Sequence, residues 1–246
     1  MPPLADGDDV EVNPSVRTFP LATQAIHADD HLNRGPDVAP ALHVSTTFRY
    51  ASKPEDLIPA QDQEHLPNPD SHIYSRETAP NTTRLEALLT PLLHAPTLTY
   101  TSGLAALHAL YVFLHPARVS IGAGYHGSHG VLALHRKLHH LSTLPLDCAP
   151  EALHPGDVVH LETPLNPTGE AYEIGVFARK AHARGAFLLV DATFGPPGLQ
   201  EPFRWGADVV VHSGTKFLGG HSDMLCGVVA TRRGAGSGRR GRFWGA

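Results

Sequence analysis

A single lysine, Lys216, stands in a setting that an ordinary surface lysine does not need. It lies in HSGTKFLGGHSD, residues 212–223, between small hydroxyl residues and a pair of glycines, directly after the apolar run ADVVV. A solvated surface position is the usual fate of a lysine. An amine that is desolvated at a strand end can instead condense with a carbonyl group and act as a covalent catalyst. The segment therefore predicts a catalytic lysine.

Four other loops carry residues suited to the same chemistry. They read TSG (101–103), GYHGSHG (124–130), ETPLNPTG (162–169) and DATFGPPG (191–198), and with SGTKFLGGHSD they supply hydroxyls, glycines, a carboxylate, an amide and the lysine. Pyridoxal phosphate needs such a set: backbone N–H groups and hydroxyls at its phosphate, a lysine at its aldehyde, a carboxylate at its pyridine nitrogen and an aromatic ring on its face. The chain offers candidates for all four contacts.

Short apolar runs that alternate with helical stretches must position these loops. Helices are expected in NTTRLEALLTPLL (81–93), GLAALHALYVFL (103–114), SHGVLALHRKLHHL (128–141) and EIGVFARKAHARG (173–185). Strands are expected in TLTYTS, RVSIG, STLPL, DVVHLE, AFLLVDATF, ADVVVHS and MLCGVVATR. This alternation predicts an α/β fold, a mainly parallel sheet with helices on both faces. Ligands of such sheets bind beyond the carboxyl ends of the strands, where these loops gather.

The composition favours a globular enzyme with a small substrate. The chain has 246 residues, of which 41% are hydrophobic and 17% charged, enough to bury a core. Its formal net charge of -5 argues against general binding to nucleic acid or to an anionic membrane. No apolar segment approaches the roughly 20 residues that span a bilayer, and the N-terminus MPPLADGDDVEVNPS is unlike a secretory or transit peptide. We therefore expect a cytoplasmic protein.

Neither the cysteines nor the histidines predict a metal site. The two cysteines, Cys148 and Cys226, form no CxxC motif and are expected to be structural thiols. Among the 18 histidines, His135, His139 and His140 could share one helical face in ALHRKLHHL. HExxH is absent and the leucines between these residues describe a plain amphipathic helix, so we expect no metal ligand there.

The order of the motifs resembles one enzyme family. The matching segments are YSRETAPNTTRLEALL, YTSGLAAL, GYHGSHG, LETPLNPTG and VDATFGPPGLQEPFRWGADVVVHSGTKFLGGHSDMLCG, within residues 24–231. Together they resemble the transsulfuration, or Cys/Met metabolism, enzymes that depend on pyridoxal phosphate. That family includes cystathionine gamma-synthases, gamma-lyases and beta-lyases, methionine gamma-lyases and homoserine sulfhydrylases. The resemblance implies the type I, aspartate-aminotransferase-like fold.

The resemblance also implies which residues contact the aldehyde and phosphate of the cofactor. Lys216 matches the Schiff-base lysine, and Ser213 and Thr215 match the hydroxyl residues beside the phosphate. Gly103 and Leu104 match the residues whose backbone contacts the phosphate, with leucine here where the family often has methionine. Once displaced from the aldehyde by a substrate, Lys216 would serve as the general base.

Further matches concern the ring of the cofactor and a second subunit. Tyr125 matches the tyrosine stacked on the ring and is expected to assist the leaving group, so it is a catalytic as well as a binding candidate. Asp191 matches the carboxylate at the pyridine nitrogen, and Asn166 matches the amide near the phenolic oxygen. Tyr74 and Arg76, in YSR, resemble the pair that reaches the phosphate of a neighbouring subunit, which implies a homodimer or homotetramer.

Taken by themselves, several of these residues also fit ordinary structural roles. Asp191 fits a helix cap or a turn, Tyr125 fits packing against the sheet, and Asn166 fits a turn before a proline. A surface strand would account for the YSR segment. His221 fits either a contact with cofactor or substrate or a hydrogen bond that shapes the glycine-rich loop, and it is given no chemical role.

The reaction implied by the resemblance is beta or gamma elimination, or gamma replacement, on a sulfur amino acid or a homoserine ester. The residues leave the choice among these branches open, and overall resemblance favours cystathionine metabolism. The substrate is then a small amino acid that Lys216 deprotonates at its alpha carbon while Asp191 supports the electron-withdrawing ring.

Three regions follow from this comparison. Residues 1–72 are expected to be a mostly irregular arm, residues 73–231 a large domain that binds pyridoxal phosphate, and residues 232–246 a basic Gly/Arg-rich tail without fixed structure. The tail GAGSGRRGRFWGA matches nothing in the family, whose members continue into a small C-terminal domain. Its GxGxxG pattern lacks a following helix and so does not predict a nucleotide site. Two hypotheses remain: a working transsulfuration enzyme, or a non-catalytic remnant that binds cofactor or a full-length homologue.

Overall fold

The computed structural model describes residues 18–58 and 72–232, which fold as two compact units. Within the described part, one unit comprises residues 18–58 and 72–92, and the other comprises residues 93–232. Most of the predicted tail, with its GxGxxG pattern, lies outside the described residues. The division places the Tyr74 and Arg76 candidates in the first unit and all the others in the second.

The first unit contains little regular structure. Its elements are the helix α1 (Leu21–His27), the short 3-10 turns η1 (Asp30–Leu32) and η2 (Pro54–Asp56), and the helix α3 (Pro80–Leu93). α3 begins one residue before the predicted helix and ends at the same residue. A single antiparallel bridge pairs Thr47 with Tyr74.

Arg84 of α3 holds the segment after α1 in place within this unit. Its guanidinium donates to the Asp29 carboxylate at 2.6 Å, to the Leu32 carbonyl at 2.8 Å and to the Asn33 side-chain oxygen at 2.8 Å. The ion pair is largely buried, with both side chains exposed by 13% or less. A charged pair out of water is tolerated where further hydrogen bonds satisfy its donors, as they do here.

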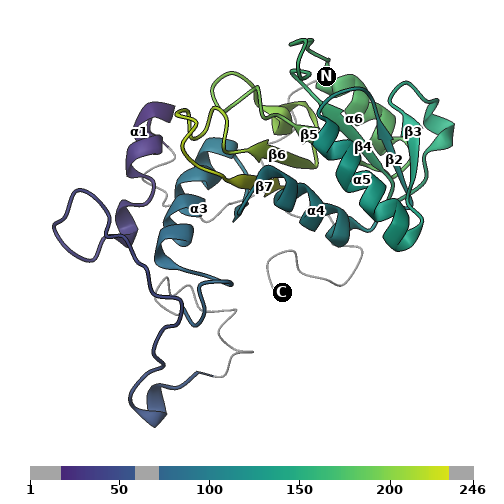
Figure 1. Ribbon diagram of the computed structural model, residues 1–246. Coiled ribbons are helices and arrows are strands. Elements are labelled where there is room, and N and C mark those ends of the chain that lie inside the picture. The colour runs from purple at the N-terminus through teal and green to yellow at the C-terminus, as the bar shows by residue number, and fades with distance from the viewer. Residues whose placement is uncertain (1–17, 59–71, 233–246) are drawn as a thin grey trace. The chain divides into compact units, whose positions relative to one another are not determined.

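The second unit is built on a seven-stranded sheet (Figure 1). Its strands are β1 (Thr97–Tyr100), β2 (Arg118–Ile121), β3 (Ser142–Pro145), β4 (Val158–Glu162), β5 (Phe187–Asp191), β6 (Val209–Ser213) and β7 (Gly227–Thr231). They lie in the order β1-β7-β6-β5-β4-β2-β3. All neighbouring pairs are parallel except those of β7 with β6 and with β1. The prediction of a mainly parallel sheet is therefore confirmed.

Three helices connect the strands of this unit: α4 (Gly103–Leu114), α5 (His126–His139) and α6 (Ile174–His182). Ser102 caps α4, because its hydroxyl accepts the Ala105 N–H at 3.1 Å. α4 and α5 both end at a histidine in the left-handed conformation, with φ of 44° at His115 and 62° at His140. α5 begins at His126, two residues earlier than predicted.

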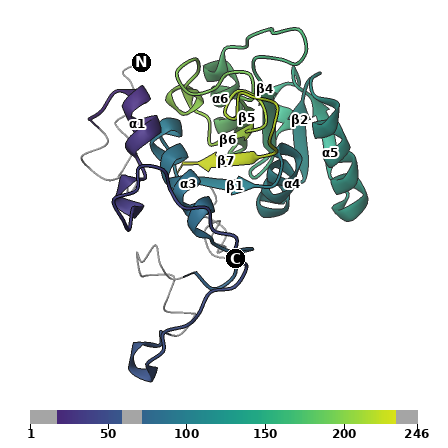
Figure 2. The same cartoon turned by 60° about the vertical axis from the view of Figure 1, so that its left-hand side comes forward.

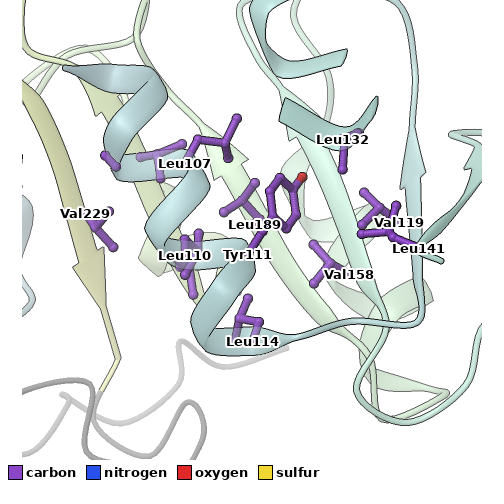
Figure 3. Close-up of a cluster of buried hydrophobic side chains, with 13 residues drawn as sticks. Leu107, Leu110, Tyr111, Leu114, Val119, Leu132, Leu141, Val158, Leu189 and Val229 are labelled. Carbon is purple, nitrogen blue, oxygen red and sulfur yellow. The ribbon is translucent and has the colours of Figure 1, made fainter. Parts of the chain in front are cut away.

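α4 and α5 cover one face of the sheet, where Figure 3 shows the core they form. Successive residues of a strand point to opposite faces, so alternate strand residues meet the helices. The buried members of this cluster are Ala106, Leu107, Leu110, Tyr111, Leu114, Val119, Leu132, Leu141, Val158, Leu189, Val209, Val211 and Val229. The same alternation determines toward which face of the sheet the last residue of each strand points.

The opposite face is covered as well. Leu188 and Val190 of β5 alternate with Leu189 and are both fully buried, although they do not belong to the cluster under α4. α6 contacts β4 and β5 and buries Ile174, Ala178 and Ala181 (Figure 2). A strand that is buried on both faces reads as a continuous apolar run, as FLLV does. Both faces of the sheet are therefore covered by helices, as predicted.

Candidate functional site

The carboxyl ends of five strands meet at one edge of the sheet. β2, β4, β5 and β6 are parallel, and β1 runs in the same direction because both β1 and β6 are antiparallel to β7. The predicted site residues of this unit all follow these ends: Gly103, Leu104, Tyr125, Asn166, Asp191, Ser213, Thr215 and Lys216. Sequence reasoning predicted this gathering from the parallel topology alone.

The alternation of the strands places three side chains on the same face at this edge. Leu189 and Val211 lie in the core beneath α4 and α5, so Asp191 and Ser213, two residues further on, lie on that face as well. Glu162 is the direct partner of Asp191 in the pairing of β4 with β5 and shares its face. α4 and α5 begin at the same edge, because they follow β1 and β2.

The start of α4 lies against the end of β6. A Cβ added at Gly103 would lie 3.0 Å from the Ser213 Cβ, a tight contact that the neighbouring strand would have to relieve by a small shift, so the helix start approaches β6 closely. The first N–H groups of a helix have no partner within it, and the Ser102 hydroxyl takes only that of Ala105. An anion at this point would meet the N-terminus of a 12-residue helix and the Ser213 hydroxyl.

The turn after β6 presents Lys216. The Lys216 N–H donates to the Ser213 carbonyl at 3.1 Å, and the Gly220 N–H donates to the Lys216 carbonyl at 2.7 Å. The Thr215 hydroxyl accepts the Cys226 N–H at 3.2 Å and so ties the turn to the start of β7. These hydrogen bonds fix the backbone, while the Lys216 side chain is exposed and free to meet a ligand from solution.

Asp191 is the carboxylate at the centre of the edge. Its Oδ1 accepts two hydrogen bonds from Thr193, one from the hydroxyl at 2.6 Å and one from the backbone N–H at 3.0 Å. Burial raises the pKa of Asp191 to about 6, the Thr193 hydrogen bonds oppose this rise, and the negative charge of Glu162 adds to it. A positively charged or hydrogen-bond-donating ligand would offset the free-energy cost of burying this charged carboxylate.

Tyr125 lies directly before α5 and beside the start of α4. A Cβ added at Gly127 would lie 2.7 Å from Cζ of Tyr125 and 2.9 Å from Cδ2 of Leu104, so the two side chains flank the same point. Gly127 leaves room for the Tyr125 ring to turn over the helix start. The structure thus brings the side chains of Tyr125 and Leu104 together.

Asn166 belongs to the loop after β4 and is partly buried. Its backbone N–H donates to Oε1 of Glu162 at 2.8 Å. The second oxygen of Glu162 accepts the Tyr125 N–H at 2.8 Å. One carboxylate therefore connects the loops that carry Tyr125 and Asn166.

Sequence reasoning missed two residues at this edge, Glu162 and Thr193. The Thr193 hydroxyl donates to Asp191 and accepts the Ser213 N–H at 2.9 Å, so it connects the ends of β5 and β6. The sequence held a signal for it, because a hydroxyl residue two positions after an aspartate is typical of a local side-chain turn. Glu162 was visible as a carboxylate at a strand end. Its partners are four and 37 positions away, and the latter contact leaves no local signal.

Tyr74 and Arg76 lie in the other unit. The Arg76 guanidinium stacks over the Tyr74 ring, with 4.1 Å between its carbon and the ring centroid, and lies 3.9 Å from the Glu77 carboxylate. The bridge to Thr47 and the hydrogen bonds that flank it hold the backbone of the YSR segment. Both side chains are exposed, so they are available to a partner.

The other candidates of the sequence have structural partners. His221 Nδ1 lies 2.8 Å from the Gly219 carbonyl, which matches the loop-shaping alternative. His135 contacts His139 at 2.9 Å and His108 at 3.0 Å through its two ring nitrogens.

Within the described ranges, no group of three His, Cys, Asp or Glu side chains is arranged to hold a metal ion. None of the helices in the same ranges has the length and apolar character that a bilayer crossing demands.

The residues at the sheet edge fit pyridoxal phosphate. The start of α4 with Ser213 suits an anion, and the exposed Lys216 amine suits an aldehyde. Asp191, whose pKa burial raises to about 6, suits a protonated ring nitrogen, since the pair would offset the cost of the buried charge. The Tyr125 ring supplies an aromatic face beside Leu104.

Comparisons with known proteins point in the same direction. The family described as Cys/Met metabolism PLP-dependent enzyme matches residues 22–244. Cystathionine gamma-lyase of Saccharomyces cerevisiae is 35% identical over 223 residues, which cover 86% of this chain and 54% of the relative. L-methionine gamma-lyase of Pseudomonas putida is 32% identical, over 85% of this chain and 54% of the relative.

Solved structures agree on the fold. The crystal structure of metB from Corynebacterium glutamicum superposes with a TM-score of 0.76 at 27% identity, over 88% of this chain and 56% of that one. This similarity confirms the predicted type I fold of pyridoxal-phosphate enzymes for the part compared. The chain spans about half the length of the curated relatives that it matches.

Proposed function

This chain belongs to the Cys/Met metabolism family of PLP-dependent enzymes, and from that premise we propose that it binds pyridoxal phosphate at the carboxyl edge of its sheet and acts on sulfur amino acids. The observation that carries the proposal is the placement of Asp191, Ser213 and the start of α4 on one face of that edge. Lys216 follows Ser213 by one tight turn. Together these groups offer the contacts that the phosphate, the ring nitrogen and the aldehyde of the cofactor would need.

Each group of the cofactor has a proposed partner in the second unit. Backbone N–H groups at Gly103 and Leu104, with the hydroxyls of Ser213 and Thr215, would hold the phosphate. Tyr125 would lie on the ring face. The remaining contacts are those of Asp191 at the ring nitrogen, Asn166 at the phenolic oxygen and Lys216 at the aldehyde.

When bound, pyridoxal phosphate supplies an aldehyde that bonds to amines and a ring that withdraws electrons from the substrate. The Lys216 amine, in its neutral form, would take the proton from the alpha carbon of the substrate and, for a reaction at the gamma carbon, a proton from the beta carbon as well. Asp191, whose Oδ1 accepts a hydrogen bond from the Thr193 hydroxyl, would hold the protonated ring nitrogen. The Tyr125 hydroxyl would donate a proton to the departing sulfur.

The favoured substrate is cystathionine. The relatives named cystathionine gamma-lyase and cystathionine beta-lyase support C–S cleavage, and a relative named as a probable cystathionine gamma-synthase supports replacement. Gamma elimination from cystathionine, followed by hydrolysis with one water, would release cysteine, ammonia and 2-oxobutanoate. The proposal includes a homo-oligomer in which Tyr74 and Arg76 contact the phosphate in a second subunit, since both side chains are exposed.

Turnover of cystathionine tests the proposal. The purified chain, loaded with pyridoxal phosphate, is incubated with cystathionine, and 2-oxo acid and cysteine are measured separately, with L-methionine as a parallel substrate. D191A is expected to lower the rate of oxo acid release by at least about 100-fold, because the charge at the ring nitrogen is lost. D147N, at an exposed aspartate outside the site loops, is the matched control. An equal rate in D191A would contradict the proposed role of the carboxylate.

A further inference from the structure

The Glu162 carboxylate forms hydrogen bonds with two loops that follow different strands, β2 and β4. Glu162 is the last residue of β4, and both of its oxygens accept backbone N–H groups, that of Tyr125 at Oε2 and that of Asn166 at Oε1, each at 2.8 Å. Neither hydrogen bond belongs to a helix or to the sheet. Such charge-assisted bonds are stronger than those between neutral groups.

Gly124 makes room for this arrangement. Its φ is +141°, a conformation that side-chain-bearing residues rarely adopt. A Cβ at this position would also collide with Oε2 of Glu162. The carboxylate reaches the Tyr125 N–H only because residue 124 has no side chain. The close approach is therefore a specific feature of the GY segment.

The position of Glu162 also has an electrostatic cost. Glu162 pairs directly with Asp191 across β4 and β5, so two carboxylates lie side by side at the edge of the sheet. The charge of Glu162 contributes to the raised pKa of Asp191, after the larger effect of burial. A neutral glutamine could accept only one of the two backbone hydrogen bonds, so the pair of contacts requires a carboxylate at this position despite the repulsion.

We propose that Glu162 is a positioning residue of the cofactor site, which fixes the backbones of Tyr125 and Asn166 so that both side chains are held toward the same ligand. The inference rests on the proposed function. It adds a residue that touches neither substrate nor cofactor in this scheme and acts through two that do. Because one carboxylate sets both loops, the tyrosine and the amide are expected to lose their positions together.

The substitution E162Q tests this role with almost no change of shape. A glutamine side chain has only one oxygen, and its NH₂ group cannot accept a hydrogen bond, so one of the two backbone contacts is lost. E151Q, at an exposed glutamate, is the matched control. In the cofactor-free chain, amide hydrogen exchange at Tyr125 or Asn166 is expected to be at least about tenfold faster in E162Q than in the wild type.

The second readout is the visible circular dichroism of the bound cofactor, which reports how its ring is held. With pyridoxal phosphate added, E162Q is expected to keep the borohydride-stable label on Lys216 and to lose at least about half of the dichroic signal per label. A residue that only fastened the loops would not change this signal. E151Q is expected to match the wild type in both measurements.

The outcomes separate the two proposals. Absence of label in the wild-type chain would overturn the proposed function. A labelled wild type together with an E162Q variant of unchanged exchange, or of faster exchange but unchanged dichroism, would overturn the positioning role alone. If E162Q does not fold, G124A carries the same test, because its methyl group would displace an intact Glu162 carboxylate. It is expected to reproduce both changes, and wild-type dichroism in G124A would contradict the inference.

Discussion

Asp191 combines a raised pKa with hydrogen bonds that favour its charged form. Burial is the larger influence and brings the pKa to about 6, while Thr193 donates twice to the same oxygen. In the cofactor-free chain, ionisation of this residue therefore costs folding free energy. The fold accepts that cost at the point where the proposed ligand carries a proton, as functional sites often do.

Replacing Asp191 is expected to stabilise the cofactor-free chain. Because the folded pKa is raised above that of the unfolded chain, the folded state holds its proton longer, and the free energy of unfolding falls as pH rises from about 4 to about 6. D191N removes this loss, so its free energy of unfolding should exceed that of the wild type by roughly 1–3 kcal/mol at pH 7.5. Urea unfolding of wild type, D191N and the control D147N measures this gain, and lower stability in D191N would contradict the stated effect of burial.

Thr193 offers a second prediction, because its hydroxyl serves both Asp191 and the Ser213 N–H. T193V keeps the shape and removes both hydrogen bonds, so we expect a loss of roughly 1–3 kcal/mol in the free energy of unfolding. The pKa of Asp191 should rise further, since the lost bonds favour its charged form. Carboxyl NMR titration reports the pKa, and T193S, which retains the hydroxyl, should resemble the wild type in both properties.

At the scale of elements, the α4 and α5 helices are joined to the sheet through a line of buried rings. The Tyr111 hydroxyl lies 2.7 Å from Nδ1 of His160 on β4, and His135 of α5 contacts His108 of α4 at 3.0 Å. Burial lowers the pKa of His160 to about 3, with a smaller effect from His129 on α5. α4, whose first residues belong to the proposed site, therefore contacts a His160 side chain that burial keeps neutral near pH 7.

Acid is expected to destabilise the fold through His160. Its folded pKa lies below the unfolded value of 6.5, so the unfolded chain takes up a proton first, and stability is lost as pH falls from about 6.5 toward 3. H160N should reduce the slope of unfolding free energy between pH 6 and 4 by about 1.4 kcal/mol per pH unit. H154N, at an exposed histidine, is the control. An unchanged slope of unfolding free energy against pH in H160N would contradict the role of His160 in acid destabilisation.

The sequence predicted the helices and strands but not the contacts that complete them. Apolar runs such as FLLV and VVV identified β5 and β6, and the alternation gave a parallel sheet. The start of α5 was wrong by two residues, because the Tyr125 N–H finds its partner in Glu162, 37 positions away. No local pattern encodes such a contact. β7 lies between β1 and β6 and is antiparallel to both, and this arrangement likewise depends on residues that are far apart in the sequence.

At the scale of the whole molecule, the candidate residues are divided between the two units. Eight candidates lie in residues 93–232, and Tyr74 and Arg76 lie in the unit of residues 18–58 and 72–92. The family resemblance assigns these two residues to a neighbouring subunit's site. Because a symmetric pair of chains would exchange them, each site would be incomplete in a lone chain.

Mixing two inactive variants tests this exchange. R76A lacks the proposed phosphate contact and K216A lacks the proposed amine, but a mixed dimer would contain one site with both residues intact. After co-refolding in equal amounts, cofactor labelling of Lys216 should recover in about one quarter of the sites, as random pairing of identical subunits gives. Each variant refolded alone is the control. Recovery no greater than that of R76A alone would contradict the shared site.

The most direct measurement is chemical labelling of the wild-type chain. The purified protein is mixed with pyridoxal phosphate, reduced with borohydride, digested and mapped by mass spectrometry, with K216A treated in parallel. We expect a visible absorption band before reduction and one labelled peptide that carries Lys216, with neither in K216A. Label spread over several exposed lysines, or equal labelling of K216A, would contradict the claim that the end of β6 forms a cofactor site.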